Sequence, residues 1–409
     1  MIPDLDSKEL YIQSPNIFEG LMLTNKRSLF KKWPSYLLLC LFFLTAIFPI
    51  LVSSQSIQKN VVTSINPYHY YTYQEMTDFF HSLKDNHSDI MSLTSIGTTY
   101  EGRDIWMVKL SDSVELNEEE PGVLLMGAHH GNEKPSFEIL IYFIKYMVEN
   151  FAKNNTDNDQ DGLFNEDPID GFDNDNDSLV DEDPSEDRVR DAINNTQIFL
   201  IPMVNPDGVE YGGKGSRKNR APNHGPFGYR KEITSYGVNL NRNYGYDWFF
   251  YKIFPLRYHF FMNVLDSSLN YRGPYPFSEN ETQAVKNFVE TKNITISLSY
   301  HSFSEVIFYP WMHTSRPTPD EDLFISVGEN ISKINKYRLV VGKNYKIPRY
   351  GGTLGTSENW LYGEIGILSY TIELCSTRAP DDPEIVHEVC LTHVGVNLYV
   401  CERSWIAYL

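Results

Sequence analysis

Several short strand-like runs in this chain have, near their carboxyl ends, polar residues that can bind a metal ion or carry a proton. The run Val123 to Met126 is followed by His130 and Glu133, the run Ile294 to Ser299 is followed by His301, and the run Gly366 to Leu374 contains Glu373. Such runs are typical of buried strands, and open α/β sheets place their chemistry beyond the carboxyl ends of strands. The pattern therefore favours an α/β chain whose functional residues meet at one edge of a sheet.

The pattern around these runs predicts the other elements. Ser136 to Phe151 has the apolar spacing of a helix that packs back on the sheet after a strand and a loop. The further elements expected are a helix at 73–83, two strands within 91–110, a strand at 197–204, a turn at 205–208, and helices at 322–335 and 383–402.

Most of the negative charge belongs to one segment. The formal charge is −19, but residues 157–187 contain 14 carboxylates and no Lys or Arg, so the remainder carries −19 + 14 = −5. No basic cluster suggests a nucleic-acid partner.

This acidic segment contains a repeat. DNDQDGLFNEDP at 157–168 recurs sixteen residues later as DNDNDSLVDEDP at 173–184. The alternating carboxylates resemble a calcium loop without its usual acid at position 12. Three closely spaced Asp side chains repel one another unless a cation or full solvation relieves them. The candidate calcium ligands are Asp157, Asp159, Asp161, Asp173, Asp175 and Asp177. A solvated, disordered acidic loop is the alternative.

The N-terminal part predicts a membrane segment. Residues 1–35 form a tail that ends with basic residues, and Tyr36 to Val52 is 17 residues long without a charge. The length is at the lower limit for a bilayer span, and the preceding basic residues orient the rest of the chain outward. We expect a signal anchor at 36–52, a linker at 53–65 and an extracellular domain at 66–409, with cleavage and secretion as the alternative.

The four Cys residues show neither CxxC spacing nor a disulfide framework. We therefore expect buried free thiols in the folded part, although an extracellular location would permit one disulfide.

His130, Glu133 and His301 together suit zinc, because two imidazoles and one carboxylate are a frequent catalytic ligand set. A second carboxylate can then take a proton from the attacking water, and Glu373 is the candidate for this general base. Each residue taken alone is more often a capped loop or satisfied core residue, and only their joint occurrence favours a site.

With these residues, the sequence from about Tyr71 to Leu409 resembles the zinc metallocarboxypeptidases of the carboxypeptidase A, B and T type. The matching motifs are HxxE at His130 and Glu133, SYHSFSEVIFYPW around His301, NPDG at Asn205 to Gly208, SRKNR around Arg217, NLNRNYGYDW around Arg242, RYGGTLGTSENWLYG around Tyr350 and YTIEL around Glu373. The resemblance implies one α/β domain with a mixed parallel and antiparallel sheet flanked by helices.

The resemblance also implies roles. Arg217 would hold the oxyanion, Glu373 would act as the base, and Asn241, Arg242 and Tyr350 would hold the terminal carboxylate of a peptide or protein substrate. A guanidinium suits that task because it can form two parallel hydrogen bonds to a carboxylate.

Two positions modify this expectation. The family usually has Asp two residues before its clamp Asn, where it orients a ligand His, and here Asn239 brings no charge. Glu358 lies in a region that contributes to the family's side-chain pocket, where an acid would favour a C-terminal Lys or Arg.

The sequence thus predicts a zinc-dependent exopeptidase that hydrolyses C-terminal peptide bonds. The alternatives are a zinc amide hydrolase acting on non-peptide or cell-wall substrates, and a calcium-dependent surface binding protein with an inert zinc site.

Overall fold

The computed structural model describes residues 69–151, 186–212, 216–221, 237–246, 248, 268–314, 316–341 and 353–405. The chain divides into two units, Met1–Ile65 and Asn66–Leu409, and every described residue belongs to the second. Within these ranges no helix has the length and apolar character needed to cross a bilayer. The predicted anchor at 36–52 lies outside the described residues, so membrane attachment stays a prediction.

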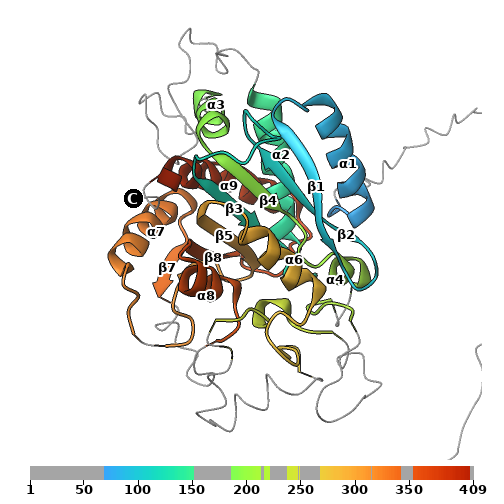
Figure 1. Ribbon diagram of the computed structural model, residues 1–409, viewed down its shortest axis with the longest axis vertical. Helices are drawn as coiled ribbons and strands as arrows, with labels where there is room; N and C mark the ends of the chain where they lie inside the picture. The colour runs from blue at the N-terminus through green and yellow to red at the C-terminus, as the bar shows by residue number, and fades with distance from the viewer. Residues whose placement is uncertain are drawn as a thin grey trace, which may run out of the picture. The chain divides into compact units, whose positions relative to one another are not determined.

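Eight strands among the described residues form one mixed sheet in the order β1-β2-β4-β3-β5-β8-β6-β7 (Figure 1). The strands are β1 (Met91–Thr98), β2 (Asp104–Leu110), β3 (Gly122–Met126), β4 (Gln197–Ile201), β5 (Ile294–Ser302), β6 (Val306–Tyr309), β7 (Arg338–Val341) and β8 (Leu368–Leu374). β4, β3, β5 and β8 run parallel to one another, whereas β2 pairs antiparallel with β4 and β6 pairs antiparallel with β8. The predicted mixed sheet is confirmed.

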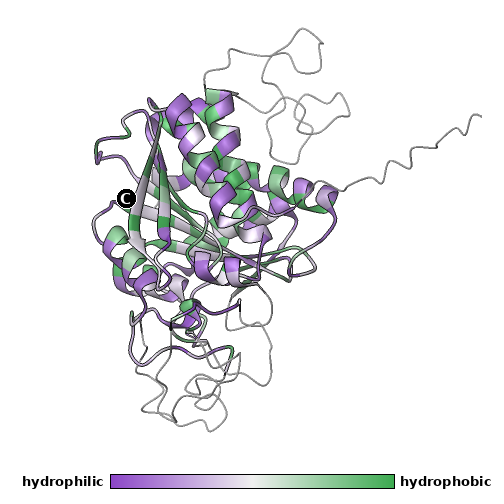
Figure 2. Cartoon of the chain, turned by 90° about the vertical axis from the view of Figure 1, so that its right-hand side faces the viewer, coloured by the Kyte–Doolittle hydropathy of each residue, from purple (hydrophilic) through white to green (hydrophobic). Residues whose placement is uncertain are grey.

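Helices cover both faces of this sheet. They are α1 (Tyr73–Asn86), α2 (Pro135–Phe151), α3 (Glu186–Asn195), α4 (Pro206–Tyr211), α6 (Asn280–Val289), α7 (Glu321–Asn335), α8 (Ser357–Trp360) and α9 (Pro383–Arg403), with short helical turns at η3 (Leu240–Arg242) and η6 (Leu361–Ile365). One hydrophobic core contains side chains of α1, α2, α3, α7 and α9, and the other contains side chains of α6, α8 and residues near η3. Figure 2 shows helices packed against the strands, which carry many hydrophobic residues.

The central strands are apolar on both faces because each supplies both cores. In β3, Val123 and Leu125 belong to one core, whereas Leu124 and Met126 belong to the other. Alternating side chains point to opposite faces of a strand, so a parallel strand covered on both sides needs an unbroken apolar run. This requirement explains the sequence runs that predicted these strands.

The predicted turn at 205–208 is wrong, because this motif begins helix α4. The Asn205 side chain accepts a hydrogen bond from the Gly208 N–H at 2.9 Å, and Pro206 occupies the first turn. Asn and Pro are favoured both in turns and at helix starts, so the local pattern did not separate the two. The preceding strand accordingly ends at Ile201 rather than Val204.

The free thiols are confirmed. Among the described residues Cys375, Cys390 and Cys401 are all buried and unbridged.

The turn after β3 packs against α4 through two glycines. A Cβ atom on Gly131 would lie 2.1 Å from the carbonyl carbon of Gly208, which is backbone and cannot move aside. The Gly131 N–H also donates to the Ser216 carbonyl at 2.8 Å. The HGNE turn, the NPDG helix and the segment that carries Arg217 are therefore held together by backbone contacts that only glycine permits.

Gly131→Ala should lower the free energy of unfolding by about 3 kcal/mol or more, because it overpacks two backbone segments. Gly366→Ala is the control, since Gly366 has a φ of +90° but a Cβ atom added there would meet no other atom within 4 Å, and should cost only about 1–2 kcal/mol. Urea unfolding measures both values, and equal losses would contradict the packing described.

Candidate metal centre

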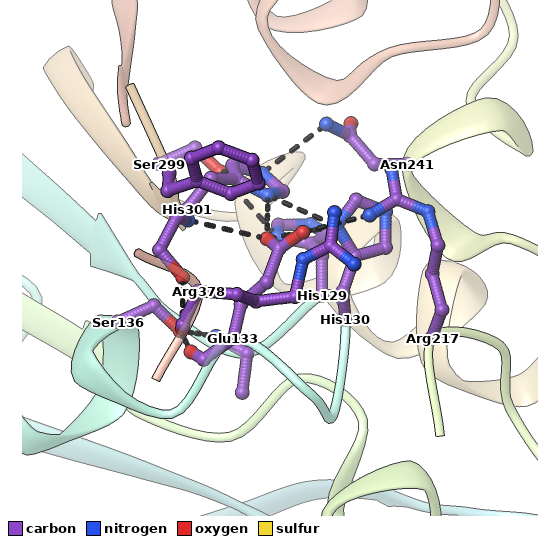
Figure 3. Close-up of polar contacts among 12 residues, drawn as sticks. His129, His130, Glu133, Ser136, Arg217, Asn241, Ser299, His301 and Arg378 are labelled. Atoms are coloured by element: carbon purple, nitrogen blue, oxygen red, sulfur yellow. Dashed lines mark hydrogen bonds and ion pairs between the residues drawn. The ribbon is translucent and has the colours of Figure 1, made fainter. Parts of the chain in front are cut away.

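Two imidazoles and one carboxylate converge at the carboxyl edge of the sheet (Figure 3). His130 and Glu133 lie in the turn between β3 and α2, and His301 is the penultimate residue of β5. β3 and β5 are hydrogen-bonded parallel neighbours, so their carboxyl ends bring these residues together from positions about 170 apart in the chain.

The three donor atoms form a small triangle. Glu133 Oε2 lies 2.9 Å from His130 Nδ1 and 2.8 Å from His301 Nδ1, and the two ring nitrogens are 3.2 Å apart. Zinc bonds of about 2.0–2.2 Å would place three tetrahedral ligands roughly 3.4 Å from one another. The triangle and its N, N, O composition therefore fit zinc, and three protein ligands are the number found in catalytic zinc sites.

The ionisation of His130 and Glu133 suits metal binding. Burial, reinforced by the charge of Arg217, lowers the pKa of His130 to about 3, so its imidazole is neutral. Burial alone would raise the pKa of Glu133, but His130, His301 and Arg217 lower it well below its usual value. A neutral imidazole and an ionised carboxylate are the forms that bind metal ions.

Asn239 orients His130. Its side-chain Nδ2 donates to the Leu269 carbonyl at 3.1 Å, which leaves Oδ1 facing His130 Nε2 at 3.0 Å. The amide oxygen can only accept, so the proton of His130 belongs on Nε2 and Nδ1 is free to bind a metal. Asn239 thus performs the orienting contact without the negative charge of the family's usual Asp.

Arg217 lies on the other side of Glu133. Its Nη1 is 2.7 Å from Glu133 Oε1, and its side chain is 16% exposed. The segment around it is held by the Asn219 side chain, whose amide donates to the buried carboxylates of Glu279 and Glu281 at 2.8 and 3.0 Å. A fixed cation is therefore placed beside the metal triangle, where negative charge can be stabilised.

The predicted carboxylate clamp is adjacent. Asn241 in η3 accepts the backbone N–H of Ser357 at 2.8 Å and directs its Nδ2 toward His301 Nε2 at 3.2 Å. Arg242 follows in the same turn and donates to the Asn241 carbonyl. The Asn241 amide therefore lies next to the triangle, and the Arg242 guanidinium is close enough to lower the pKa of Glu373.

Glu373 lies beside His301, since these two residues are partners in the parallel β5–β8 pairing. Burial raises the pKa of Glu373 to about 7, and the charge of Glu133 adds to this, although His301, Arg217 and Arg242 oppose it. A carboxyl group with a pKa near neutrality suits proton transfer at neutral pH.

Glu358 in α8 is 2% exposed, and its Oε2 has no hydrogen-bond partner among the described residues.

Tyr350 lies outside the described residues, so its predicted role stays a prediction. The same holds for the six candidate calcium ligands Asp157, Asp159, Asp161, Asp173, Asp175 and Asp177, and for calcium binding itself.

Three buried polar residues around the site were not predicted. His129 precedes the ligand His130, Ser299 lies two residues before His301 in β5, and Tyr244 follows the clamp segment. Ser299 could have been found from strand periodicity, because residues i and i+2 share a face. The His129–Tyr244 contact, 2.8 Å between Nε2 and Oη, had no sequence signal.

We expect Asn239→Asp to tighten zinc binding, because a carboxylate would polarise the His130 ring more strongly than an amide does. Asn239→Leu should weaken zinc binding about 10–100-fold, since it leaves Nε2–H unpaired in a buried position. Competition with a chromophoric chelator measures both dissociation constants. Equal affinities in the three proteins would rule out an orienting role for Asn239.

Comparison with known proteins agrees with this geometry. The sequence model of the family described as zinc carboxypeptidase matches residues 76–391. A zinc carboxypeptidase from Saccharothrix mutabilis subsp. capreolus is 29% identical over 317 residues, which cover 75% of this chain and only 62% of that relative. A carboxypeptidase B from Astacus astacus is 26% identical over 322 residues, covering 75% of this chain and 87% of the relative.

A solved structure shares the fold. The crystal structure of the carboxypeptidase A from Helicoverpa armigera superposes with a TM-score of 0.62 at 19% identity, covering 82% of this chain and 73% of that one. The family match spans well over half of the sequence, and the chain therefore belongs to the zinc carboxypeptidase family.

Proposed function

We propose that this protein is a zinc-dependent carboxypeptidase that hydrolyses the C-terminal peptide bond of peptides or proteins. The observation that carries the proposal is the convergence of His130, Glu133 and His301 at a sheet edge that also holds Glu373. The names of the relatives, which include a zinc carboxypeptidase and a carboxypeptidase B, support the same reaction class.

His130, Glu133 and His301 would hold the ion. Bound zinc supplies a Lewis acid that polarises the scissile carbonyl and makes water easier to deprotonate. Glu373 takes the proton from the attacking water and later gives it to the leaving amine, a transfer that its pKa of about 7 favours. Arg217 stabilises the negative charge that develops on the carbonyl oxygen.

Asn241 and Arg242 bind the free terminal carboxylate of the substrate, and Tyr350 joins them. A guanidinium and an amide can donate several hydrogen bonds to one carboxylate, which an amidated terminus lacks. The positions of Asn241 against His301 and of Arg242 beside it keep this contact close to the reacting bond. Recognition of the free terminus makes the enzyme an exopeptidase.

The full-length protein should shorten free-acid peptides one residue at a time, should leave C-terminally amidated peptides intact, and should lose activity when zinc is chelated.

Glu373→Gln should reduce kcat by about 10²–10⁴-fold, because it removes the proton carrier. Glu384→Gln, an exposed carboxylate on α9, is the matched control and should behave as wild type. Mass spectrometry of the products and steady-state kinetics provide the measurements.

Full activity in Glu373→Gln would contradict the mechanism. Hydrolysis of non-peptide or cell-wall amides without any peptide shortening would instead favour the alternative amide hydrolase. Zinc binding without hydrolysis of either substrate would favour the binding protein with an inert zinc site.

We further propose a preference for C-terminal Lys or Arg. Ser357, whose N–H contacts the clamp residue Asn241, directly precedes Glu358 in α8. The Glu358 carboxylate is close enough to contribute to the raised pKa of both His301 and Tyr244, which places it in the neighbourhood of the site. Its buried Oε2, without a partner among the described residues, can accept a charge-assisted hydrogen bond from a basic side chain.

Glu358→Gln should lower kcat/KM for peptides that end in Lys or Arg by about tenfold or more, and should change the value for a C-terminal Leu little. The comparison uses three peptides that differ only in the last residue. A wild-type enzyme that cleaves the Leu peptide best would overturn the basic preference without affecting the proposed reaction.

A further inference from the structure

His129 is a buried histidine beside the metal triangle that the proposed reaction does not use. Its side chain is 0% exposed, and its ring stacks on that of His301 with centroids 5.5 Å apart and an interplanar angle of 20° (Figure 3). Both of its ring nitrogens have partners, Ser299 Oγ at 3.4 Å from Nδ1 and Tyr244 Oη at 2.8 Å from Nε2. These two contacts fix the orientation of the buried ring.

The hydrogen on His301 requires an acceptor. His301 faces the metal triangle with Nδ1, so a metal-binding His301 carries its proton on Nε2. Two side chains lie near that nitrogen, Asn241 Nδ2 at 3.2 Å and Ser299 Oγ at 3.3 Å.

Asn241 cannot accept this proton. Its Oδ1 accepts the backbone N–H of Ser357, which turns the NH₂ group toward His301. An amide nitrogen only donates, so the Asn241 NH₂ group lies against Nε2–H without forming a hydrogen bond to it. Among the described residues, the acceptor for His301 Nε2–H is therefore the hydroxyl of Ser299.

The remaining hydrogens follow from this assignment. Ser299 can donate its own proton to His129 Nδ1, and His129 can then donate its Nε2 proton to Tyr244 Oη. In the opposite arrangement His129 would donate to Ser299 and Ser299 would donate to His301 Nε2. That arrangement puts the His301 proton on Nδ1, the atom that must bind the metal.

We propose that Ser299, His129 and Tyr244 are positioning residues that hold the proton of His301 on Nε2 and so keep Nδ1 available to zinc. The proposal rests on the metal site of the proposed function and is independent of its substrate. It gives His301 the counterpart of the Asn239 contact that orients His130. Both imidazoles of the triangle then have a defined tautomer.

The test is a double-mutant cycle on zinc affinity in the full-length protein. Ser299→Ala and His129→Phe should each weaken zinc binding about tenfold, since the contacts of Ser299 are long and the usual range for such residues is about 10–100-fold. The double variant should bind zinc as tightly as the single variant with the lower zinc affinity, because both changes break the same line of hydrogen bonds.

His129→Asn is the conservative variant. The Oδ1 atom of Asn and the Nδ1 atom of His are separated from Cα by the same number of bonds. The Asn oxygen can therefore accept the hydrogen bond from Ser299, and zinc affinity should stay near the wild-type value. Thermal melting of each zinc-free variant provides the control for general destabilisation. If the role of His129 were purely structural, the melting midpoint would fall, but His129→Asn and His129→Phe would have the same zinc affinity.

Nuclear magnetic resonance of the zinc-loaded protein with ¹⁵N-labelled histidine supplies a second readout. The His301 Nε2 proton should give a slowly exchanging signal in wild type and in His129→Asn, and should exchange faster in Ser299→Ala. Unchanged zinc affinity in both single variants, additive losses in the double variant, or an unaltered His301 signal in Ser299→Ala would overturn the proposal. Peptide hydrolysis is not used in this experiment, so its outcome is separable from that of the proposed function.

Discussion

The site depends on one carboxylate oxygen, Glu133 Oε2, that two imidazole nitrogens approach within 2.9 Å in a buried position. An ionised carboxylate is costly to bury unless charges or a metal compensate it. Here Arg217 binds the second oxygen, and the surrounding charges keep the pKa of Glu133 well below its usual value. The other features of the site can be understood as ways to satisfy and orient this cluster.

The sheet supplies the framework for that arrangement. Parallel strands β3, β5 and β8 end at the same edge, so residues far apart in the sequence meet there without long loops. The close contact of Gly131 with Gly208 then places the HGNE turn against α4 and against the segment of Arg217. Backbone packing therefore positions the turn of His130 and Glu133 and the segment of Arg217, and strand pairing positions His301 and Glu373.

Much of the sheet and most residues of the site could be predicted from the sequence, because the ends of the strands and the spacing of the motifs indicate where these residues lie. Apolar runs that lead into His130, His301 and Glu373 predicted three strands and the edge at which their residues meet. The helix at Pro206 was missed because Asn-Pro signals a turn and a helix start equally well. His129, Ser299 and Tyr244 were missed because buried hydrogen bonds between distant segments depend on side-chain orientation, which local patterns do not encode. Tyr350 and the acidic repeat lie outside the described residues, so their roles rest on the sequence alone.

X-ray absorption at the zinc edge of the zinc-loaded protein can show whether His130, Glu133 and His301 hold one zinc ion. We expect one zinc per chain with two imidazole ligands and only nitrogen or oxygen donors, at about 2.0–2.2 Å. His301→Ala should lose one imidazole contribution or the zinc itself. A sulfur shell at about 2.3 Å, or an identical spectrum in His301→Ala, would mean that these three residues do not hold the ion.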